Sequence, residues 1–471
     1  MLTTVENENS LFLVKNYNGN KLTMDIYYKN ASKIEKVAFD VKYSSMCFKK
    51  TRLLVFFLGK VRYWEKIYFI LWFYQYNIEK LYFIVWFYKN NNVIYYIEED
   101  EVCMEMSYYD SLNDEVKEYF SILSPEFPQW LLEYIDTPEM QRINGISMSC
   151  GTDYSKCFNV RYWYSNLDHS VGVALIIWHF THDKKQTLAG LFHDIATPVF
   201  KHCIDFMNGD SETQESTEER TTDIIKNSSS IMSLLKRDGI KLEEVNDYKM
   251  YPIADNSTPM LSADRFEYTF SSGLTFFRVW ELDKIRKIFN NVIVVKNEEN
   301  VDELGFKDIE VCEEYIHIIS KLWPEWVSDK DRTVMQFLAD MTKSMINAGY
   351  LTIDDLYTLP ECEVINIFSN CEDSYLAEKF KAFQNEDTVY QSDDYVDEKY
   401  CVNVKSKSRY IVPLVLNENS VTRINNVSKQ ANAEIEEYLR IPKGGYYTYF
   451  DFSFKPYGKG TTKKIGKIRH R

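Results

Sequence analysis

The sequence predicts a mainly α-helical protein that begins with an aromatic-rich segment in which strands are favoured. Thr137-Pro138-Glu139 indicates a helix start, since a hydroxyl can cap the helix, proline suits its first position and an acid follows. Further along, residues recur at the spacing of one helix face, at His169, Val173, Ile176 and Phe180. Positions 1–107 differ, because β-branched and aromatic residues are enriched there.

The N-terminal segment, residues 1–107, contains a near-duplicate. The run 65–74 is repeated as 79–88, at a spacing of 14 residues. Each copy holds an apolar run of eight residues, a length that suits a buried strand. Two strands are therefore predicted, with Trp72 and Trp86 at equivalent positions, because an even spacing preserves the face of a strand.

A membrane-spanning helix is the alternative for residues 67–88, which are almost wholly apolar. Glu79 and Lys80 would then lie near its centre, where each charge costs roughly 2.5–3.5 kcal/mol. Membrane association is therefore disfavoured. A third interpretation is a sequence expansion without a role of its own.

A helical domain is predicted from residue 108 to about residue 400. Its expected helices start at Ser124-Pro125-Glu126, at Thr137 and near His169. Another covers residues 187–196 and ends there, because Pro198 disfavours a helical conformation at the residue before it.

Further along, residues 208–227 are polar and acidic, which predicts that this segment lies on the protein surface. Helices are expected within 231–290 and 308–350, and the pattern at 352–355 resembles a capping box before another.

A small mixed α/β part is predicted for residues 401–471. Strands are expected at 410–416 and after the turn at Gly444-Gly445. From Lys455 to Arg471 the chain carries seven lysines and arginines and no acid. This tail is interpreted either as a solvated end or as an arm that contacts phosphate or nucleic acid.

Composition excludes several classes of protein. The net charge of −15 opposes non-specific binding to nucleic acid or to anionic membranes, although a local basic groove for a phosphorylated ligand remains compatible with it. The nine cysteines are odd in number and lack a CxxC pair, which argues against a disulfide framework or a zinc ribbon. A reducing, cytoplasmic compartment is expected, since the first residues also lack the pattern of a secretory signal.

Two imidazoles and two carboxylates form a candidate metal site: His169, His193, Asp194 and Asp264. Such a mixed nitrogen and oxygen ligand set suits a hard or borderline divalent metal. A metal of this kind acidifies a bound water and polarises a phosphoryl oxygen. These residues therefore predict metal-assisted phosphoester chemistry, provided that they converge in space.

The order of these residues and their flanking sequence resemble the HD superfamily of metal-dependent phosphohydrolases, in particular the branch that contains the deoxynucleoside triphosphate triphosphohydrolases. The resemblance runs from about Thr137 to about Tyr268 and is strongest around His193-Asp194, in LAGLFHDIATPVFKH. It returns at 409–415, where RYIVPLV looks like the RYIDPLV segment of that branch. The resemblance implies an HD-type helical bundle and the same four metal ligands. The expected cofactor is a divalent metal, Mn, Fe, Mg, Zn or Co, and the sequence does not distinguish among them.

The chain departs from this branch in its acid–base residues. Where the branch has HDxGHxPFSH, the glycine is Ala196 and the inner histidine is Thr197, while the last histidine matches His202. A downstream His-Glu is replaced by Gln214-Glu215, and the arginine three residues before the first ligand is Asn166. Threonine and glutamine cannot titrate near neutral pH, so poor hydrolysis of deoxynucleoside triphosphates is expected.

His202 and Glu215 are the remaining candidates for catalytic proton transfer, although a structural histidine and a solvated acid are the competing interpretations. Arg142, Arg265 and Tyr268 are candidates for substrate binding, with surface salt bridges as the alternative for the arginines.

The predicted function is a divalent-metal-dependent phosphohydrolase that acts on a nucleotide or another phosphate ester. The alternative is an HD domain that binds a metal and a nucleotide or phosphate as a regulatory module with little turnover. The expected partner is a phosphorylated small molecule; the sequence carries no strong nucleic-acid signal and leaves a homo-oligomer open.

Overall fold

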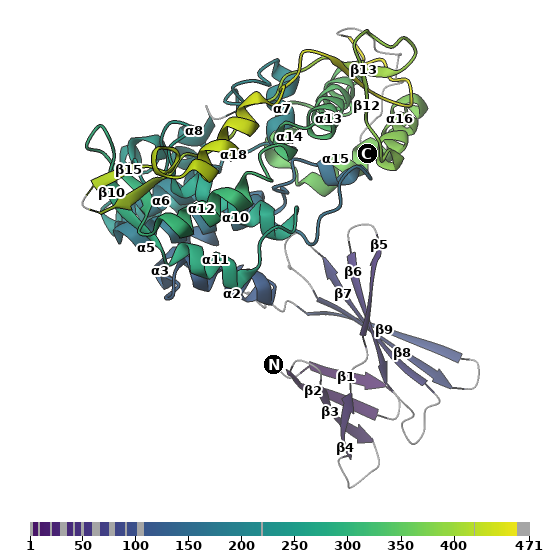
Figure 1. Ribbon diagram of the computed structural model, residues 1–471. Coiled ribbons are helices and arrows are strands. Elements are labelled where there is room, and N and C mark those ends of the chain that lie inside the picture. Colours follow the sequence, from purple (N-terminus) through teal and green to yellow (C-terminus); the bar gives the residue numbers. More distant parts are fainter. Residues whose placement is uncertain are drawn as a thin grey trace. The chain divides into compact units, whose positions relative to one another are not determined.

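The computed structural model describes residues 108–217, 220–418 and 420–458 together with the strands that precede them (Figure 1). The chain forms two compact units, residues 1–106 and 107–471. The basic tail lies outside the described residues from position 459 onward, and so does the prediction of a phosphate-contacting arm there.

The N-terminal unit consists of two antiparallel sheets, each with its strands in chain order. The first sheet comprises β1 (Thr3–Asn7), β2 (Ser10–Asn18), β3 (Lys21–Tyr28) and β4 (Glu35–Asp40). The second comprises β5 (Tyr43–Phe48), β6 (Thr51–Leu58), β7 (Lys66–Tyr74), β8 (Leu81–Lys89) and β9 (Asn92–Asp100).

The two copies of the repeat are the neighbouring strands β7 and β8, so the predicted strands are confirmed. Their register pairs Tyr68 with Trp86 and Trp72 with Tyr82, which places each tryptophan opposite a tyrosine of the other copy. The alternative of one continuous helix across 67–88 is wrong. Among the described residues, no helix combines the length and the apolar character needed to cross a membrane.

The second unit is mainly helical, as predicted. Its N-terminal half contains α1 (Tyr108–Ser111), α2 (Asp114–Leu123), α3 (Gln129–Ile135), α4 (Pro138–Asn144), α5 (Asn166–Thr181), α6 (Lys184–Phe192), α7 (His202–Asn208), α8 (Thr221–Asn227) and α9 (Ser229–Asp238). Its C-terminal half contains α10 (Ala263–Thr275), α11 (Leu282–Phe289), α12 (Ile309–Ile319), α13 (Asp329–Asn347), α14 (Asp355–Thr358), α15 (Glu361–Asn370), α16 (Ser374–Asn385), α17 (Ile424–Val427) and α18 (Lys429–Arg440).

Two small sheets complete this unit. One has the strand order β10-β11-β14-β15 and the other β12-β16-β13. Their bounds are β10 (Val292–Lys296), β11 (Asp302–Phe306), β12 (Tyr390–Ser392), β13 (Tyr400–Val402), β14 (Leu414–Asn417), β15 (Ser420–Arg423) and β16 (Tyr447–Phe450). The strand expected after Gly444-Gly445 is β16, and the strand expected at 410–416 begins only at Leu414, as β14. The β10–β11 hairpin was not predicted, despite the β-branched run in β10.

Two helix boundaries differ from the predictions. Ser124-Pro125-Glu126 is not a helix start: α2 ends just before it, and α3 begins only after Pro128, which disfavours a helical conformation at the preceding residue. The helix expected over 187–196 is α6, which already ends at Phe192. By contrast, α4 begins after Thr137, as predicted, and Thr352 and Asp355 form the expected reciprocal capping bonds.

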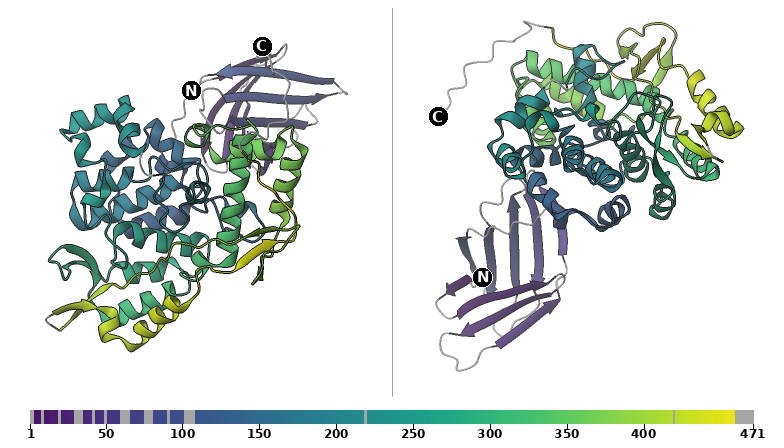
Figure 2. Two further views of the ribbon diagram at one scale, coloured as in Figure 1. Left: turned by 90° about the horizontal axis from the view of Figure 1, so that it is seen from above. Right: turned by 90° about the vertical axis from the view of Figure 1, so that its left-hand side faces the viewer.

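The hydrophobic core of the helical unit has two parts. One is built around α5, α6, α10 and α12, and the other around α13, α15 and α16 with α7. Figure 2 shows the C-terminal segment, in yellow-green, running along both groups of helices. The chain passes from the first part at Ile195 to the second at Val199, so the residues from His193 to His202 lie where the two parts meet.

Candidate metal centre

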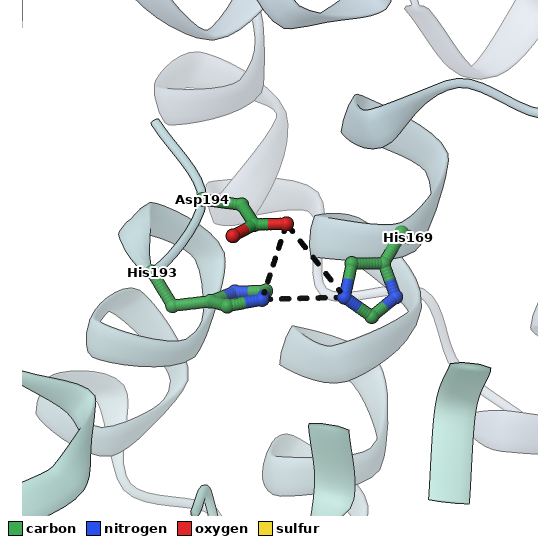
Figure 3. Close-up of side chains that lie close together, drawn as sticks. All are labelled: His169, His193 and Asp194. Atoms are coloured by element: carbon green, nitrogen blue, oxygen red, sulfur yellow. Dashed lines mark hydrogen bonds and ion pairs between the residues drawn. The ribbon is translucent and has the colours of Figure 1, made fainter. Parts of the chain in front are cut away.

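Three of the four predicted ligands, His169, His193 and Asp194, place one ligand atom each within 4.8 Å of one another, and Asp264 approaches the two histidines. His169 lies in the first turn of α5, His193 and Asp194 follow the end of α6, and Asp264 is the second residue of α10. The two histidine Nε2 atoms are 3.2 Å apart (Figure 3). Asp194 Oδ2 lies 4.0 Å and 3.7 Å from the Nε2 atoms of His169 and His193, and Asp264 Oδ1 lies 3.2 Å and 3.9 Å from them.

The start of α5 is fixed by a capping box in front of His169. Ser165 Oγ accepts a hydrogen bond from the Asp168 amide, and Asp168 Oδ2 accepts one from the Ser165 amide. Asp168 Oδ1 also accepts the Tyr108 hydroxyl at 2.6 Å. These bonds satisfy donors that a helix start otherwise leaves unpaired. They also fix the position of the next residue, His169.

The end of α6 is shaped by Arg142. Its Nη2 donates to the carbonyl oxygens of Ile195 at 2.9 Å and of Thr197 at 2.8 Å, in the turn that follows the helix. Arg142 is absent from the described residues that line the adjoining cavity. The structure thus places this predicted substrate ligand behind the metal centre, where it holds the turn that carries His193 and Asp194.

The hydrogen bonds of the two rings direct both Nε2 atoms inward. His193 Nδ1 lies 2.7 Å from the Gly190 carbonyl oxygen, which can only accept, so this nitrogen carries the proton. His169 Nδ1 donates in the same way to Glu267 Oε2. With Nδ1 of each ring engaged in this way, Nε2 is the ring nitrogen left to coordinate a metal, and the two Nε2 atoms face each other.

Glu267 is a residue that the sequence reasoning did not single out. It is fully buried on α10, three residues after Asp264, and it accepts the hydroxyls of Tyr164 at 2.6 Å, Tyr119 at 3.3 Å and Ser271 at 3.1 Å. The sequence signal that could have identified Glu267 is its position three residues after Asp264 on the same helix, because residues at this spacing share a helix face.

The negative charge of this region also suits a cation. Burial lowers the pKa of His169, but Glu267 and Asp264 outweigh it and raise this pKa to about 9. Burial and the charge of Asp264 raise the pKa of Asp255 to about 6. Ligand types, ring orientation and charge all fit a divalent metal held by His169, His193, Asp194 and Asp264.

A cavity of about 640 Å³ opens onto the metal centre. Its lining includes four of the five residues predicted for catalysis or substrate binding, namely His202, Glu215, Arg265 and Tyr268. It also includes side chains that the sequence reasoning did not select, among them Lys201, Asp331, Trp326 and Arg409.

His202 is oriented by a buried carboxylate. Its Nδ1 donates to Asp205 Oδ2 at 3.0 Å, and Asp205 Oδ1 accepts the Ser216 hydroxyl at 2.7 Å. Burial lowers the pKa of His202, an effect only partly opposed by Asp205. Asp331, in the first turn of α13, lines the same cavity, and burial raises its pKa to about 7.

Glu215 is less constrained than His202. Its side chain is 57% exposed and lies 3.9 Å from Lys407 Nζ. The preceding Gln214 is buried and accepts a hydrogen bond from the Arg409 guanidinium, which comes from the far C-terminal segment.

Arg265 and Tyr268 line the cavity, but Arg265 is occupied within the protein. It donates to Asn256 Oδ1 at 2.6 Å, to the Met260 carbonyl and the Ser262 hydroxyl at 3.2 Å, and lies 3.3 Å from Asp255. Its role in the structure is to hold the loop before α10. Tyr268 packs edge-on against Trp326, with ring centroids 5.3 Å apart, and burial raises its pKa to about 12.

Comparison with known proteins gives distant relatives. No family model matches the chain. It is 22% identical over 319 residues to the uncharacterized protein YdhJ of Bacillus subtilis, across 67% of this chain and 93% of that protein. It is 23% identical over 146 residues to the metal-dependent phosphohydrolase cns2 of Cordyceps militaris, across 31% of this chain and 41% of that protein.

Two solved structures are similar at a TM-score of 0.49. One is a hypothetical protein from Aquifex aeolicus, 16% identical, with 69% of this chain and 93% of that chain covered. The other is a phosphohydrolase from Bacteroides thetaiotaomicron, 13% identical, with 69% and 96% covered.

Proposed function

We propose that this protein is a divalent-metal-dependent phosphohydrolase of the HD type that acts on a nucleotide or another phosphate ester. The cluster of His169, His193 and Asp194 beside a large cavity, with the two Nε2 atoms facing each other and Asp264 close to both rings, carries this proposal. The partial sequence similarity to the metal-dependent phosphohydrolase cns2 supports it.

When bound, the metal would polarise a phosphoryl oxygen and acidify a water. His202 is the residue best placed to accept a proton, because Asp205 holds the hydrogen on Nδ1 and leaves Nε2 as the acceptor. Its lowered pKa keeps the ring neutral at pH 7, which favours the role of a base over that of an acid.

The two arginines predicted for substrate binding are not free to bind a triphosphate. A triphosphate needs several cations and donors around its charge. Arg142 lies outside the lining, and the side-chain donors of Arg265 are engaged by the loop before α10. We therefore expect slow release of triphosphate from deoxynucleoside triphosphates.

A panel of phosphate monoesters, diesters and nucleotides, assayed with added Mn²⁺, Fe²⁺, Mg²⁺ or Co²⁺, tests the proposal. Turnover of at least one ester by the wild-type protein, lost in Asp194→Ala together with the bound metal, is the expected result. Metal and phosphate binding without turnover of any ester would favour a regulatory module, and absence of metal binding would refute both.

A further inference from the structure

Lys201 carries a buried ammonium group that touches a candidate metal ligand. The residue is 7% exposed, and its Nζ donates to Asp194 Oδ2 at 3.1 Å. This is the same oxygen that faces the two histidine rings. Among the lysines and arginines that the structure describes, Lys201 is the one within ion-pair distance of a candidate ligand.

The backbone at this position is held in an unfavourable conformation. Phe200 and Lys201 have φ angles of 65° and 44°, in the left-handed region that non-glycine residues seldom adopt. Such residues persist only where their surroundings impose the conformation, and they concentrate at functional sites. Here Phe200 is fully buried in the second core cluster, while Lys201 lines the cavity beside Asp194.

The three N–H groups of Lys201 are unequally satisfied. Two donate to oxygen atoms, those of Asp194 and of the buried Asn166. The third points to the thioether sulfur of Met148 at 3.0 Å, and a thioether is a weak acceptor. Met148 also lines the cavity, so a stronger acceptor entering from the cavity can take its place.

We propose that Lys201 is the phosphate-binding cation of the metal centre, and that a phosphoryl oxygen of the ligand replaces the Met148 sulfur as its third acceptor. The inference rests on the proposed function. A charged hydrogen bond to phosphate is strong, and this one would lie next to the atoms that hold the metal.

A binding role and a structural role of Lys201 predict different effects on the metal. If the ammonium serves to bind phosphate, its loss weakens phosphate binding but removes a positive charge that repels the metal ion. If the ammonium instead serves only to position Asp194, its loss weakens the binding of both.

Lys201→Met, which keeps the length of the side chain without its charge, separates the two roles. Mn²⁺ binding is measured by calorimetry, and inorganic phosphate binding to the Mn²⁺-loaded protein by broadening of the phosphorus resonance. We expect Mn²⁺ to bind at least as tightly as to the wild type, and phosphate to bind roughly 10- to 100-fold more weakly.

Lys236→Met, at an exposed position of α9, controls for the change in net charge and should match the wild type. Unchanged phosphate affinity in Lys201→Met, or loss of both Mn²⁺ and phosphate, overturns the inference and leaves the proposed function standing. Wild-type protein that binds Mn²⁺ but no phosphate also overturns it, and wild-type protein that binds no Mn²⁺ refutes the proposed function itself.

Discussion

At the scale of single residues, the metal centre depends on partners behind its ligands. His169 would present Nε2 to a metal because its other ring nitrogen, Nδ1, donates a hydrogen bond to Glu267, and Glu267 is in turn held by three hydroxyls. An acceptor of this kind raises the basicity of the ligand and fixes the ring.

Glu267→Gln should therefore lower metal affinity about 10- to 100-fold. The neutral amide keeps the size of the side chain but removes the charge that favours a proton on His169 Nδ1. Mn²⁺ titration followed by calorimetry measures the effect. Glu243→Gln, at an exposed position, is the control, and equal affinity in the two variants would contradict the role given to Glu267.

The His202–Asp205 pair predicts a dependence of activity on pH. The pKa of His202 is lowered by burial from its ordinary value of 6.5, so kcat/KM should rise with pH through a point below 6.5 as the base becomes neutral. His202→Gln should lower kcat/KM by about 10²- to 10⁴-fold and abolish this rise.

Two further variants sharpen this test. The rise should persist in Asp331→Asn, which removes a second cavity group that titrates near neutrality, with a pKa of about 7. His317→Gln, at a surface histidine paired with Glu434, should behave as the wild type. If the rise of kcat/KM with pH is lost in Asp331→Asn, the base is Asp331 and not His202.

At the scale of elements, the close approach of α5 and α10 brings His169 to Glu267. Gly172 allows this approach: a Cβ atom there would lie 2.7 Å from Cγ and Oε1 of Glu267. The contact between Gly172 and Glu267 is possible because α5 and α10 are buried on the sides that face each other. It sets the position of the Glu267 carboxylate behind His169.

Gly172→Ala should destabilise the protein by about 1–3 kcal/mol and weaken metal binding, because the methyl group displaces Glu267. Ser170→Ala, on the same helix, is the matched control. Its hydroxyl has no hydrogen-bond partner among the described residues, so its loss should cost little. Denaturant unfolding and Mn²⁺ titration measure both effects, and a fully stable Gly172→Ala would refute the contact.

The start of α15 predicts a pH-dependent stability. Glu361 is fully buried, and burial raises its pKa well above 4.5. The unfolded chain releases this proton at a lower pH than the folded protein, so the free energy of unfolding should fall as pH rises above 4.5.

Glu361→Gln mimics the protonated acid and should remove this loss. The variant should be the more stable protein at pH 8, with little difference at pH 4.5, and the gap should grow by at most about 1.4 kcal/mol per pH unit. Chemical unfolding at both pH values measures it. A variant less stable than wild type at pH 8 would contradict the prediction.

At the scale of the whole molecule, residues distant in sequence complete the centre. Arg409 reaches Gln214 from the C-terminal segment, and β14 of that segment pairs with β11. Every residue assigned to the site lies in the unit 107–471.

A protein of residues 107–471 should therefore bind Mn²⁺ with the affinity of the full chain. The two core clusters that the structure describes are built from residues of this unit, as is the site. Calorimetric titration of both proteins measures the affinity. Loss of Mn²⁺ binding by a folded 107–471 protein would show that the first unit contributes to the site.

The sequence by itself determined the features that depend on neighbouring residues. The mainly helical class, the start of α4, the capping box at Thr352 and the strands of the repeat follow from local patterns of capping and periodicity. Residue type and flanking sequence also identified the candidate ligands, of which the structure clusters His169, His193 and Asp194 and places Asp264 beside the two histidines.

Only the tertiary structure decided what depends on partners far along the chain. Arg142 holds the turn after α6 through the carbonyl oxygens of Ile195 and Thr197, and Lys201 meets Asn166, although neither contact has a local signal. The physical reason is that a charged side chain can satisfy its hydrogen bonds with a carbonyl, a carboxylate or a ligand. Which of these it meets is set by the packing of helices that the sequence separates by tens of residues.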